Sequence, residues 1–275
     1  MFLQKCKGEK TLWKKGDIIM SSVLKSLKYI EIETCNTCTR SCEWCPFGSF
    51  EGYRPKKPSF LDTKYIHSIL NELAEIHFNG QLSLFSINEP LMDKRIISGE
   101  LISLSKAELK DAILLLITNG DLLTDLIICN MFEAGLDKLL VSCYDDETYN
   151  KTEFYKQKYS YAIDHLDKRY FNNGDWEYNR AGSVNCKDDS KYKQCHIPVF
   201  QSIIGYDGEV RLCCYDALGV SKLGNIKSNK LSEILDNDKI NSLRKQIQEN
   251  RTTISPCDVC NVEGTIEWLY NNWNF

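Results

Sequence analysis

The chain has 275 residues, which is enough for one large domain or two modest ones with a substantial hydrophobic core. Its 43% hydrophobic and 26% charged residues are ordinary globular proportions, and they exclude a mainly disordered, collagen-like or coiled-coil chain. The net charge of −4 at pH 7 disfavours binding along a nucleic-acid backbone. Cysteine is the exception, because 13 cysteines are more than packing requires and an odd number cannot all pair in disulfides.

The sequence also carries signals about cellular location. The N-terminal residues lack the apolar segment of a signal peptide, and no apolar run approaches the roughly 18 residues of a membrane span. We therefore expect a cytoplasmic protein whose partners include neither a membrane nor a nucleic acid. The cytoplasm is reducing, and there clustered cysteines bind metal more often than they form disulfides.

Strands and helices alternate through the first part of the chain. Residues 29–33 are expected to form a strand with Ile30 and Ile32 on one face. Asp62 is expected to cap a helix whose apolar residues recur at helical spacing. The elements expected after it are strands at residues 81–86, 112–117 and 139–141 and helices at residues 95–107 and 124–134. Repeated strand–helix units predict parallel strands joined by right-handed crossovers, in an open sheet or a barrel.

The pattern changes near residue 172, where we place a domain boundary. We expect an N-terminal extension at residues 1–28, a first domain at residues 29–172 and a second, smaller domain at residues 173–275. The elements expected in the second domain are a β-hairpin over residues 199–213 and a helix from about residue 231.

The first group of cysteines directly follows the first predicted strand. Cys38, Cys42 and Cys45 have the spacing C-x3-C-x2-C. A cubane of four irons has four corners, and thiolates normally hold all of them. Three cysteines on one loop would leave one iron open to a cofactor or substrate, as an open position does on catalytic zinc. The alternative is a zinc site in which Cys35 is the fourth ligand.

The three cysteines, with the aromatic Trp44 just before the last of them, resemble the motif of the radical S-adenosylmethionine (SAM) enzymes. The resemblance implies an α/β fold, a partial (βα)6 barrel with a [4Fe–4S] cluster at the carboxyl ends of its strands. It also implies that SAM binds the open iron. An electron from an external reductant, such as flavodoxin or ferredoxin, would then cleave SAM to a 5′-deoxyadenosyl radical that removes a hydrogen atom from the substrate.

Two further stretches resemble SAM contacts of this family. Asn88 and Glu89 follow the second strand, where the family usually carries Gly-Gly-Glu. Both glycines are absent, so the resemblance carries over through Glu89, as a contact to the methionyl ammonium, and through Asn88. Thr118 and Asn119 end the third strand, and the resemblance implies that their side chains face the nucleoside. The alternatives are a surface charge at Glu89 and an ordinary turn after Thr118.

The second group of cysteines lies in the C-terminal part of the chain. Its members are Cys195, Cys213, Cys257 and Cys260. The predicted hairpin brings the first two to one end of a small sheet, and the C-x2-C pair can then close a four-thiolate site. The spacing fits a zinc ribbon and an iron–sulfur cluster equally. Beside the first motif it resembles the SPASM and Twitch domains, which implies one fully ligated auxiliary [4Fe–4S] cluster for electron transfer or support of the fold.

Within this family the chain resembles the dehydrogenases of natural product biosynthesis that act on aminocyclitols. The matching stretches include residues 88–91, 118–121 and 223–226. The resemblance implies that Arg180 lies at the substrate. It also implies that the enzyme oxidises a carbinol of a sugar or aminocyclitol to a ketone, with the auxiliary cluster as the electron acceptor. Cys214-Tyr215 departs from the Phe-Glu of those enzymes, which removes a carboxylate expected to favour an amine-bearing substrate.

Two other functions stay open from the sequence. One is an epimerase or a maturase of ribosomal peptides, in which the thiol of Cys214 or Cys186 donates a hydrogen atom. The other is a zinc- or iron–sulfur-binding module or electron carrier without enzymatic activity. This second alternative leaves Glu89 and the Thr118-Asn119 pair unexplained.

Overall fold

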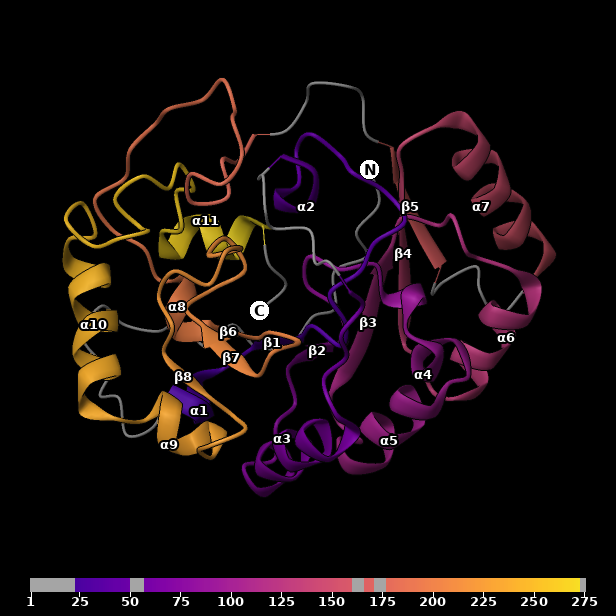
Figure 1. Cartoon of the computed structure of the whole chain (residues 1–275), viewed down its shortest axis with the longest axis horizontal. Coiled ribbons are helices and arrows are strands. Elements are labelled where there is room, and N and C mark those ends of the chain that lie inside the picture. Colours follow the sequence, from indigo (N-terminus) through magenta and orange to yellow (C-terminus); the bar gives the residue numbers. More distant parts are fainter. Residues whose placement is uncertain (1–22, 50–56, 160–165, 171–176, 273–275) are drawn as a thin grey trace.

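The computed structural model describes residues 23–49, 57–159, 166–170 and 177–272 (Figure 1). The strands are β1 (Tyr29–Ile32), β2 (Gln81–Ser83), β3 (Ile113–Thr118), β4 (Lys138–Cys143), β5 (Leu166–Tyr170), β6 (Gln201–Ile204), β7 (Glu209–Arg211) and β8 (Gly224–Asn225). Within the described residues these eight strands form one mixed sheet in the order β5-β4-β3-β2-β1-β6-β7-β8. Strands β1 to β6 run parallel, which confirms the α/β class predicted from the alternation of elements.

The position of β6 differs from a simple succession of strands around a barrel. β6 pairs in parallel with β1, with Tyr29 opposite Gln201, and so lies at the other end of the parallel series from β5. Because β2 pairs with the opposite edge of β1, the first strand has a parallel partner on each side and its backbone groups are paired. The C-terminal part of the chain therefore supplies the sixth parallel strand of the partial barrel.

The predicted hairpin is present as β6 and β7, which pair antiparallel with Ile204 opposite Val210. It does not form a sheet of its own, because β6 also pairs with β1. Residues of the two predicted domains therefore share one sheet. The boundary near residue 172 lies within residues 171–176, outside the described residues, and stays a prediction, as does the extension at residues 1–28, of which 1–22 are not described.

Helices follow the strands as the repeated units predict, and Figure 1 shows them along the outside of the parallel strands and beside the C-terminal hairpin. They are α1 (Val23–Ser26), α2 (Pro46–Ser49), α3 (Thr63–Glu75), the 3₁₀ turn η1 (Pro90–Met92), α4 (Lys94–Ile97), α5 (Glu100–Glu108), α6 (Asp125–Glu133), α7 (Asp146–Lys158), α8 (Ile197–Phe200), α9 (Leu231–Leu235), α10 (Asp238–Glu249) and α11 (Ile266–Asn272).

Short polar side chains and one glycine decide where several helices begin and end. Asp62 accepts a hydrogen bond from a backbone N–H at 3.0 Å and begins α3, as predicted. The predicted helix over residues 95–107 is instead two helices, because Gly99 interrupts it with a φ of +80°. The predicted helix from residue 231 is also two helices, because the side chain of Asn237 caps the start of α10.

Strand β1 separates the hydrophobic core from the interior of the barrel. Ile30 and Ile32 are fully buried, as their shared face predicts. The alternate residues, Tyr29 and Glu31, line a cavity on the other side of the sheet. Strand periodicity alone places these two polar side chains inside the barrel.

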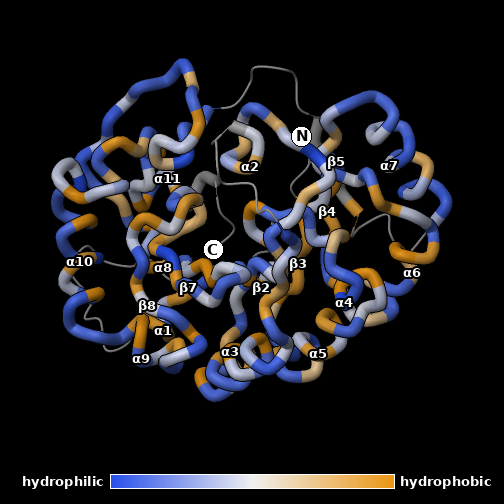
Figure 2. Tube along the Cα trace, in the orientation of Figure 1, coloured by the Kyte–Doolittle hydropathy of each residue, from blue (hydrophilic) through white to orange (hydrophobic). Residues whose placement is uncertain are grey.

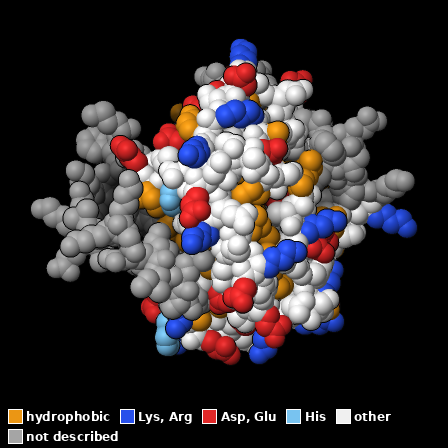
Figure 3. Space-filling model, turned by 90° about the vertical axis from the view of Figure 1, so that its left-hand side faces the viewer, with side chains coloured by type: hydrophobic (Ala, Val, Ile, Leu, Met, Phe, Trp, Pro, Cys, Tyr) orange, Lys and Arg blue, Asp and Glu red, His pale blue; other side chains and the backbone are white. Residues whose placement is uncertain are grey.

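The surface that the structure describes carries charged side chains of both signs. In Figure 2, hydrophobic and hydrophilic segments alternate along the turns of α3 and α10, as in amphipathic helices with one face on the core. Figure 3 shows Lys and Arg side chains interspersed with Asp and Glu over the face that carries α10. None of the described helices is long and apolar enough to cross a membrane.

Candidate active site

A cavity of about 510 Å³ extends from the inner face of β1 to the loops that follow β2, β3 and β4. Residues predicted separately from the sequence line it together. They are Cys38, Cys42, Trp44, Cys45, Asn88, Glu89, Thr118, Asn119, Arg180 and Cys214. The fold therefore brings the first cysteine group, the predicted SAM contacts and the predicted substrate contact into one site at the carboxyl ends of parallel strands.

The first cysteine group lies on a tightly wound loop. Cys45 N donates to Cys42 O at 3.1 Å, and a Cβ on Gly48 would lie 2.4 Å from the same oxygen. Burial raises the pKa of the Cys38 thiol to about 12 and that of Cys42 to about 11, and neighbouring thiols of the group add to both shifts. Three thiols on one loop match the number of ligands that a four-iron cluster with one open iron requires.

Arg40 ties this loop to the loops that follow β3 and β4. Its guanidinium donates to Asp121 at 2.5 and 2.9 Å and to Asp145 at 2.6 Å. The pKa of Asp145 is lowered to about 2, first by the hydrogen bond from Thr148 N and then by Arg40. This contact was not predicted from the sequence. The sequence feature that could have indicated it is the position of Asp121, directly after the predicted turn that follows Thr118.

Glu89 is buried and fixed by three donors. Its Oε1 accepts from Thr118 Oγ1 at 2.6 Å and from Leu91 N at 3.1 Å, and its Oε2 accepts from Asn119 N at 2.8 Å. Burial raises the pKa of Glu89 to about 7, and these hydrogen bonds oppose that shift. The two stretches predicted as SAM contacts therefore touch each other directly. Asn119 also contacts the loop of the first cysteine group, because its Nδ2 donates a hydrogen bond to Thr39 Oγ1 at 2.9 Å.

Asn88 joins the active-site loop to the buried Cys35. Its Oδ1 accepts from Ser86 N at 3.0 Å, and its Nδ2 donates to Cys35 Sγ at 3.3 Å. The thiol of Cys35 in turn donates to the carbonyl oxygen of Glu89 at 3.8 Å. Cys35 is fully buried, so its contacts support the loop that carries Asn88 and Glu89.

The four cysteines of the second group line a small separate cavity beside α8 and β7. Burial raises the pKa of Cys213 well above its usual range, and the thiols of Cys195, Cys257 and Cys260 raise it further. Burial raises the pKa of Cys195 to about 11, and the buried guanidinium of Arg251 opposes that shift. Four thiols beside a buried cation fit a group held by thiolates. No three His, Cys, Asp or Glu side chains in the described part of the chain are placed to hold a single metal ion.

Consecutive cysteines connect the two cavities. Cys213 lines the second cavity, whereas Cys214 lines the first. Cys214 N donates to Gln201 Oε1 at 3.2 Å, and Gln201 Nε2 donates to Glu31 Oε1 at 2.9 Å. Gln201 and Glu31 were not among the residues predicted from the sequence. Each is a polar residue on the inner face of a buried strand. Such a residue needs a hydrogen-bond partner or a function, and this feature of the sequence could have pointed to both.

Arg180 lines the first cavity from the segment that precedes the second cysteine group. Its φ of +48° places it in a left-handed turn with Ala181 at +50° and Gly182 at +85°. The guanidinium lies 5.7 Å from the ring centre of Tyr215. Its positive charge faces Cys214, Tyr215, Cys45 and Glu31.

Two known family models match the segments that contain the two cysteine groups. Residues 32–168 match the model of the radical SAM superfamily, and residues 195–261 match the SPASM model, an iron–sulfur cluster-binding domain. The chain belongs to the radical SAM superfamily. This radical SAM enzyme uses SAM and iron–sulfur clusters, so the zinc interpretations of the two sites and the non-enzymatic alternative are wrong.

Individual relatives of this radical SAM enzyme agree with that assignment. The S-adenosyl-L-methionine-dependent 2-deoxy-scyllo-inosamine dehydrogenase of Niallia circulans is 26% identical over 244 residues, which are 86% of this chain and 94% of the relative. The crystal structure of BtrN in complex with AdoMet and 2-DOIA matches with a TM-score of 0.75 and 25% identity over 87% of this chain and 95% of BtrN. The structure of anSMEcpe with bound AdoMet, at 14% identity and a TM-score of 0.51 over 78% of this chain and 82% of the other, shares the fold.

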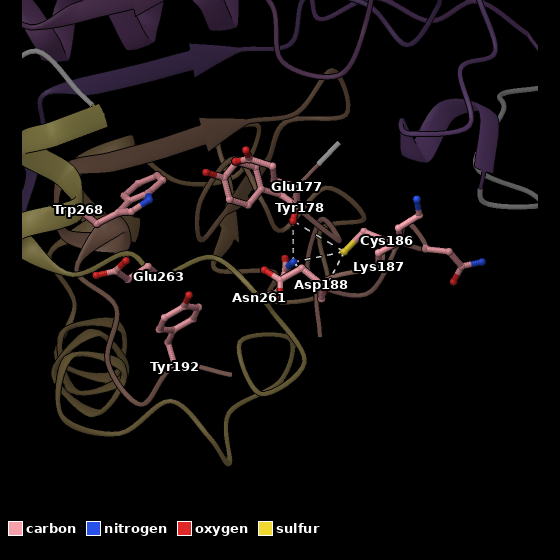
Figure 4. A pocket seen from close by; sticks show the side chains of 10 residues that line it. Glu177, Tyr178, Cys186, Lys187, Asp188, Tyr192, Asn261, Glu263 and Trp268 are labelled. Carbon is pink, nitrogen blue, oxygen red and sulfur yellow. Dashed lines mark hydrogen bonds between the residues drawn. The ribbon is translucent and has the colours of Figure 1, made fainter. Parts of the chain in front are cut away.

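Another cavity, of about 980 Å³, shares no lining residue with this site. Figure 4 shows Cys186 in it, where Asn261 Nδ2 donates to the sulfur at 3.3 Å. Tyr178, Tyr192 and Trp268 line the same cavity. Of the two thiols considered as hydrogen donors, Cys214 therefore lines the cavity of the first cysteine group, and Cys186 lines the other.

Proposed function

We propose that this radical SAM enzyme oxidises a secondary alcohol of a sugar or aminocyclitol to a ketone. The observation that carries the proposal is the adjacency of Cys213 and Cys214, which line different cavities. The first cavity and the second cysteine group are therefore one residue apart along the chain, which gives a short path for an electron that leaves a substrate in the first cavity. The activity in the name of the 2-deoxy-scyllo-inosamine dehydrogenase relative supports the same reaction.

The proposal assigns each cofactor to residues of this chain. Cys38, Cys42 and Cys45 hold the radical SAM cluster, and Cys195, Cys213, Cys257 and Cys260 hold the auxiliary cluster. Trp44, Asn88, Glu89, Thr118 and Asn119 surround SAM. When bound, SAM and the clusters supply an acceptor for one hydrogen atom and an acceptor for one electron.

Glu89 is assigned to the methionyl ammonium of SAM. Three donors hold its carboxylate in one orientation, so no rearrangement is needed when a cation binds. Asn119 connects this carboxylate to the cysteine loop through Thr39, which sets the amine contact and the cluster loop in one rigid frame.

Arg180 is assigned to an oxygen of the substrate. A guanidinium remains charged at all physiological pH values, and here the ring of Tyr215 limits its movement. Trp44 and Tyr144, whose ring centres are 5.3 Å apart, form an aromatic wall of the same cavity and keep water from the reacting carbon.

The size of the site favours a small substrate. The cavity of about 510 Å³ has to accommodate SAM as well as the substrate, which suits a cyclitol better than a peptide. The proposal includes an external one-electron donor, flavodoxin or ferredoxin, and a cytoplasmic location, where such donors work.

Epimerisation is the second candidate, because the thiol of Cys214 lines the active-site cavity. A thiol there could return a hydrogen atom to the opposite face of the substrate carbon. The two candidates differ in the product, since an epimer has the oxidation state of the substrate and a ketone does not.

The test is anaerobic turnover of the cluster-loaded enzyme with SAM, a chemical reductant and either 2-deoxy-scyllo-inosamine or the amine-free scyllo-inositol. Oxidation predicts one 5′-deoxyadenosine for each ketone formed. The same reaction in D2O distinguishes the candidates. Solvent deuterium at the reacting carbon, with an unchanged oxidation state, would contradict the dehydrogenase and support the epimerase.

A further inference from the structure

We propose that Glu31 receives the hydroxyl proton of the substrate when the carbinol is oxidised. The inference rests on the proposed function and deepens it by naming the base. No motif of the sequence pointed to Glu31, and its placement in the barrel carries the argument.

Glu31 is held inside the barrel by the alternation of β1. Ile30 and Ile32 on either side are fully buried in the core, so the side chain between them points to the opposite face of the sheet. There it lines the same cavity as the first cysteine group, Glu89 and Arg180. A substrate bound beside Arg180 would therefore occupy a cavity that Glu31 also lines.

Gln201 fixes the orientation of this carboxyl group. A backbone N–H can only donate, so the hydrogen bond from Cys214 N requires the amide oxygen of Gln201 to face Cys214. The NH2 group of Gln201 must then face Glu31, to which it donates at 2.9 Å. The loop of the second cysteine group thus positions Glu31 through one intervening side chain.

The chemistry of the cavity requires such a base. Conversion of a carbinol to a ketone removes a hydrogen atom from carbon, a proton from oxygen and one electron. Arg40 and Arg180 line the cavity but cannot accept a proton, because a guanidinium is already protonated. The carboxylate of Glu89 already accepts three hydrogen bonds. Of the carboxylates that line the cavity in the described part of the chain, this leaves Glu31.

Its environment suits proton transfer near neutral pH. Burial raises the pKa of Glu31 to about 7, which places the group near the optimum for a general base. The charged and titratable groups that face it are Arg180, which lowers its pKa, Glu33, which raises it, and Cys214. Hydrogen bonds from Ser86 and Gln201 also favour the carboxylate.

The step balances with the cofactors of the family. The C–H bond breaks and its hydrogen atom goes to the SAM-derived acceptor. The O–H proton goes to the carboxylate of Glu31, the remaining electron goes to the auxiliary iron–sulfur cluster, and C–O becomes C=O. Because the carboxylate is the active form, ketone formation should decrease as the pH falls below about 7.

The experiment compares Glu31→Gln and Glu31→Asp with the wild type, and with Glu133→Gln as an exposed control. With 2-deoxy-scyllo-inosamine, Glu31→Gln should lower kcat about 100-fold or more and abolish the low-pH decrease. SAM binding and iron content should be unchanged. Glu31→Asp should recover part of the rate and retain a low-pH decrease. A change in KM alone would mean that Glu31 only binds the substrate and would overturn the proposal.

A second measurement does not depend on turnover. An infrared titration of the cluster-loaded protein should show a protonated carboxyl group near neutral pH in the wild type that is missing from Glu31→Gln. Titration of that group in the usual range of a glutamate would overturn the proposal. If the wild type forms no ketone, the proposed function fails and this role with it. If wild type and Glu31→Gln form ketone equally fast, this proposal fails and the function stands.

Discussion

Glu89 shows how a single side chain can join two parts of a binding site. Replacing it by Gln removes the charge and turns one acceptor into a donor, so that the backbone N–H of either Leu91 or Asn119 loses its acceptor. We expect Glu89→Gln to weaken SAM binding by about 1.5–3 kcal/mol, the range of a hydrogen bond to a charged group. Calorimetric titration of the cluster-loaded protein with SAM measures this.

The control for that substitution is Glu100→Gln, an exposed glutamate at the start of α5. It should bind SAM as the wild type does, and both variants should keep their full iron content. Equal SAM affinity of Glu89→Gln and the wild type would remove Glu89 from the SAM site.

Substitution of the single residue Cys214 distinguishes the two candidate reactions. Its backbone N–H positions Gln201, and substitution by Ala keeps that N–H while removing the thiol. A dehydrogenase with Cys214→Ala should still form one ketone per 5′-deoxyadenosine. An epimerase with the same change should continue to cleave SAM while the inverted product disappears. Chromatographic quantification of nucleoside and product decides between them.

At the scale of elements, Glu72 joins α3 to α9 across 159 positions of sequence. Its carboxylate accepts from Leu231 N and Ser232 N, both at 2.9 Å, and from Ser232 Oγ at 2.7 Å. These contacts satisfy the first N–H groups of α9, which have no partner inside the helix. A residue of the first predicted domain thus caps a helix of the second.

We expect Glu72→Ala to lower the free energy of unfolding by about 1.5–3 kcal/mol, because buried donors at the start of α9 lose a charged acceptor. Anaerobic urea unfolding of the cluster-loaded protein measures this. Glu75→Ala, on an exposed position of the same helix, provides the control and should change little. Equal loss in both variants would mean that the effect comes from α3 alone.

For the whole molecule, the two cysteine groups predict the metal content. Anaerobic reconstitution should load about eight iron atoms and eight sulfides per chain. Changing Cys38, Cys42 and Cys45 together to Ala should leave about half, because the second group has its own cavity. Iron and acid-labile sulfide analysis tests this. Loss of all iron from the triple variant would show that the sites do not load independently.

Local sequence was sufficient wherever a property depends on neighbouring residues. The alternation around Ile30 predicted the buried face of β1, and Asp62 predicted the start of α3, because periodicity and capping involve only a few adjacent positions. The spacing of Cys38, Cys42 and Cys45 indicated their chemistry for the same reason. The breaks at Gly99 and Asn237 were missed, since helical periodicity continues across them.

Contacts between distant segments were decided by the tertiary structure. The sequence alone determined the α/β class, the two cysteine groups and the polar residues that follow β2 and β3. The pairing of β6 with β1 brings Gln201 to Glu31 and places Cys214 beside the active-site cavity. This pairing joins residues about 170 positions apart. The sequence of a strand does not reveal which strand will pair with it, because the backbone hydrogen bonds are the same for every sequence. The tertiary structure buries Glu31, and this burial raises the pKa of its carboxyl group. No local motif of the sequence indicates that Glu31 is available to accept a proton.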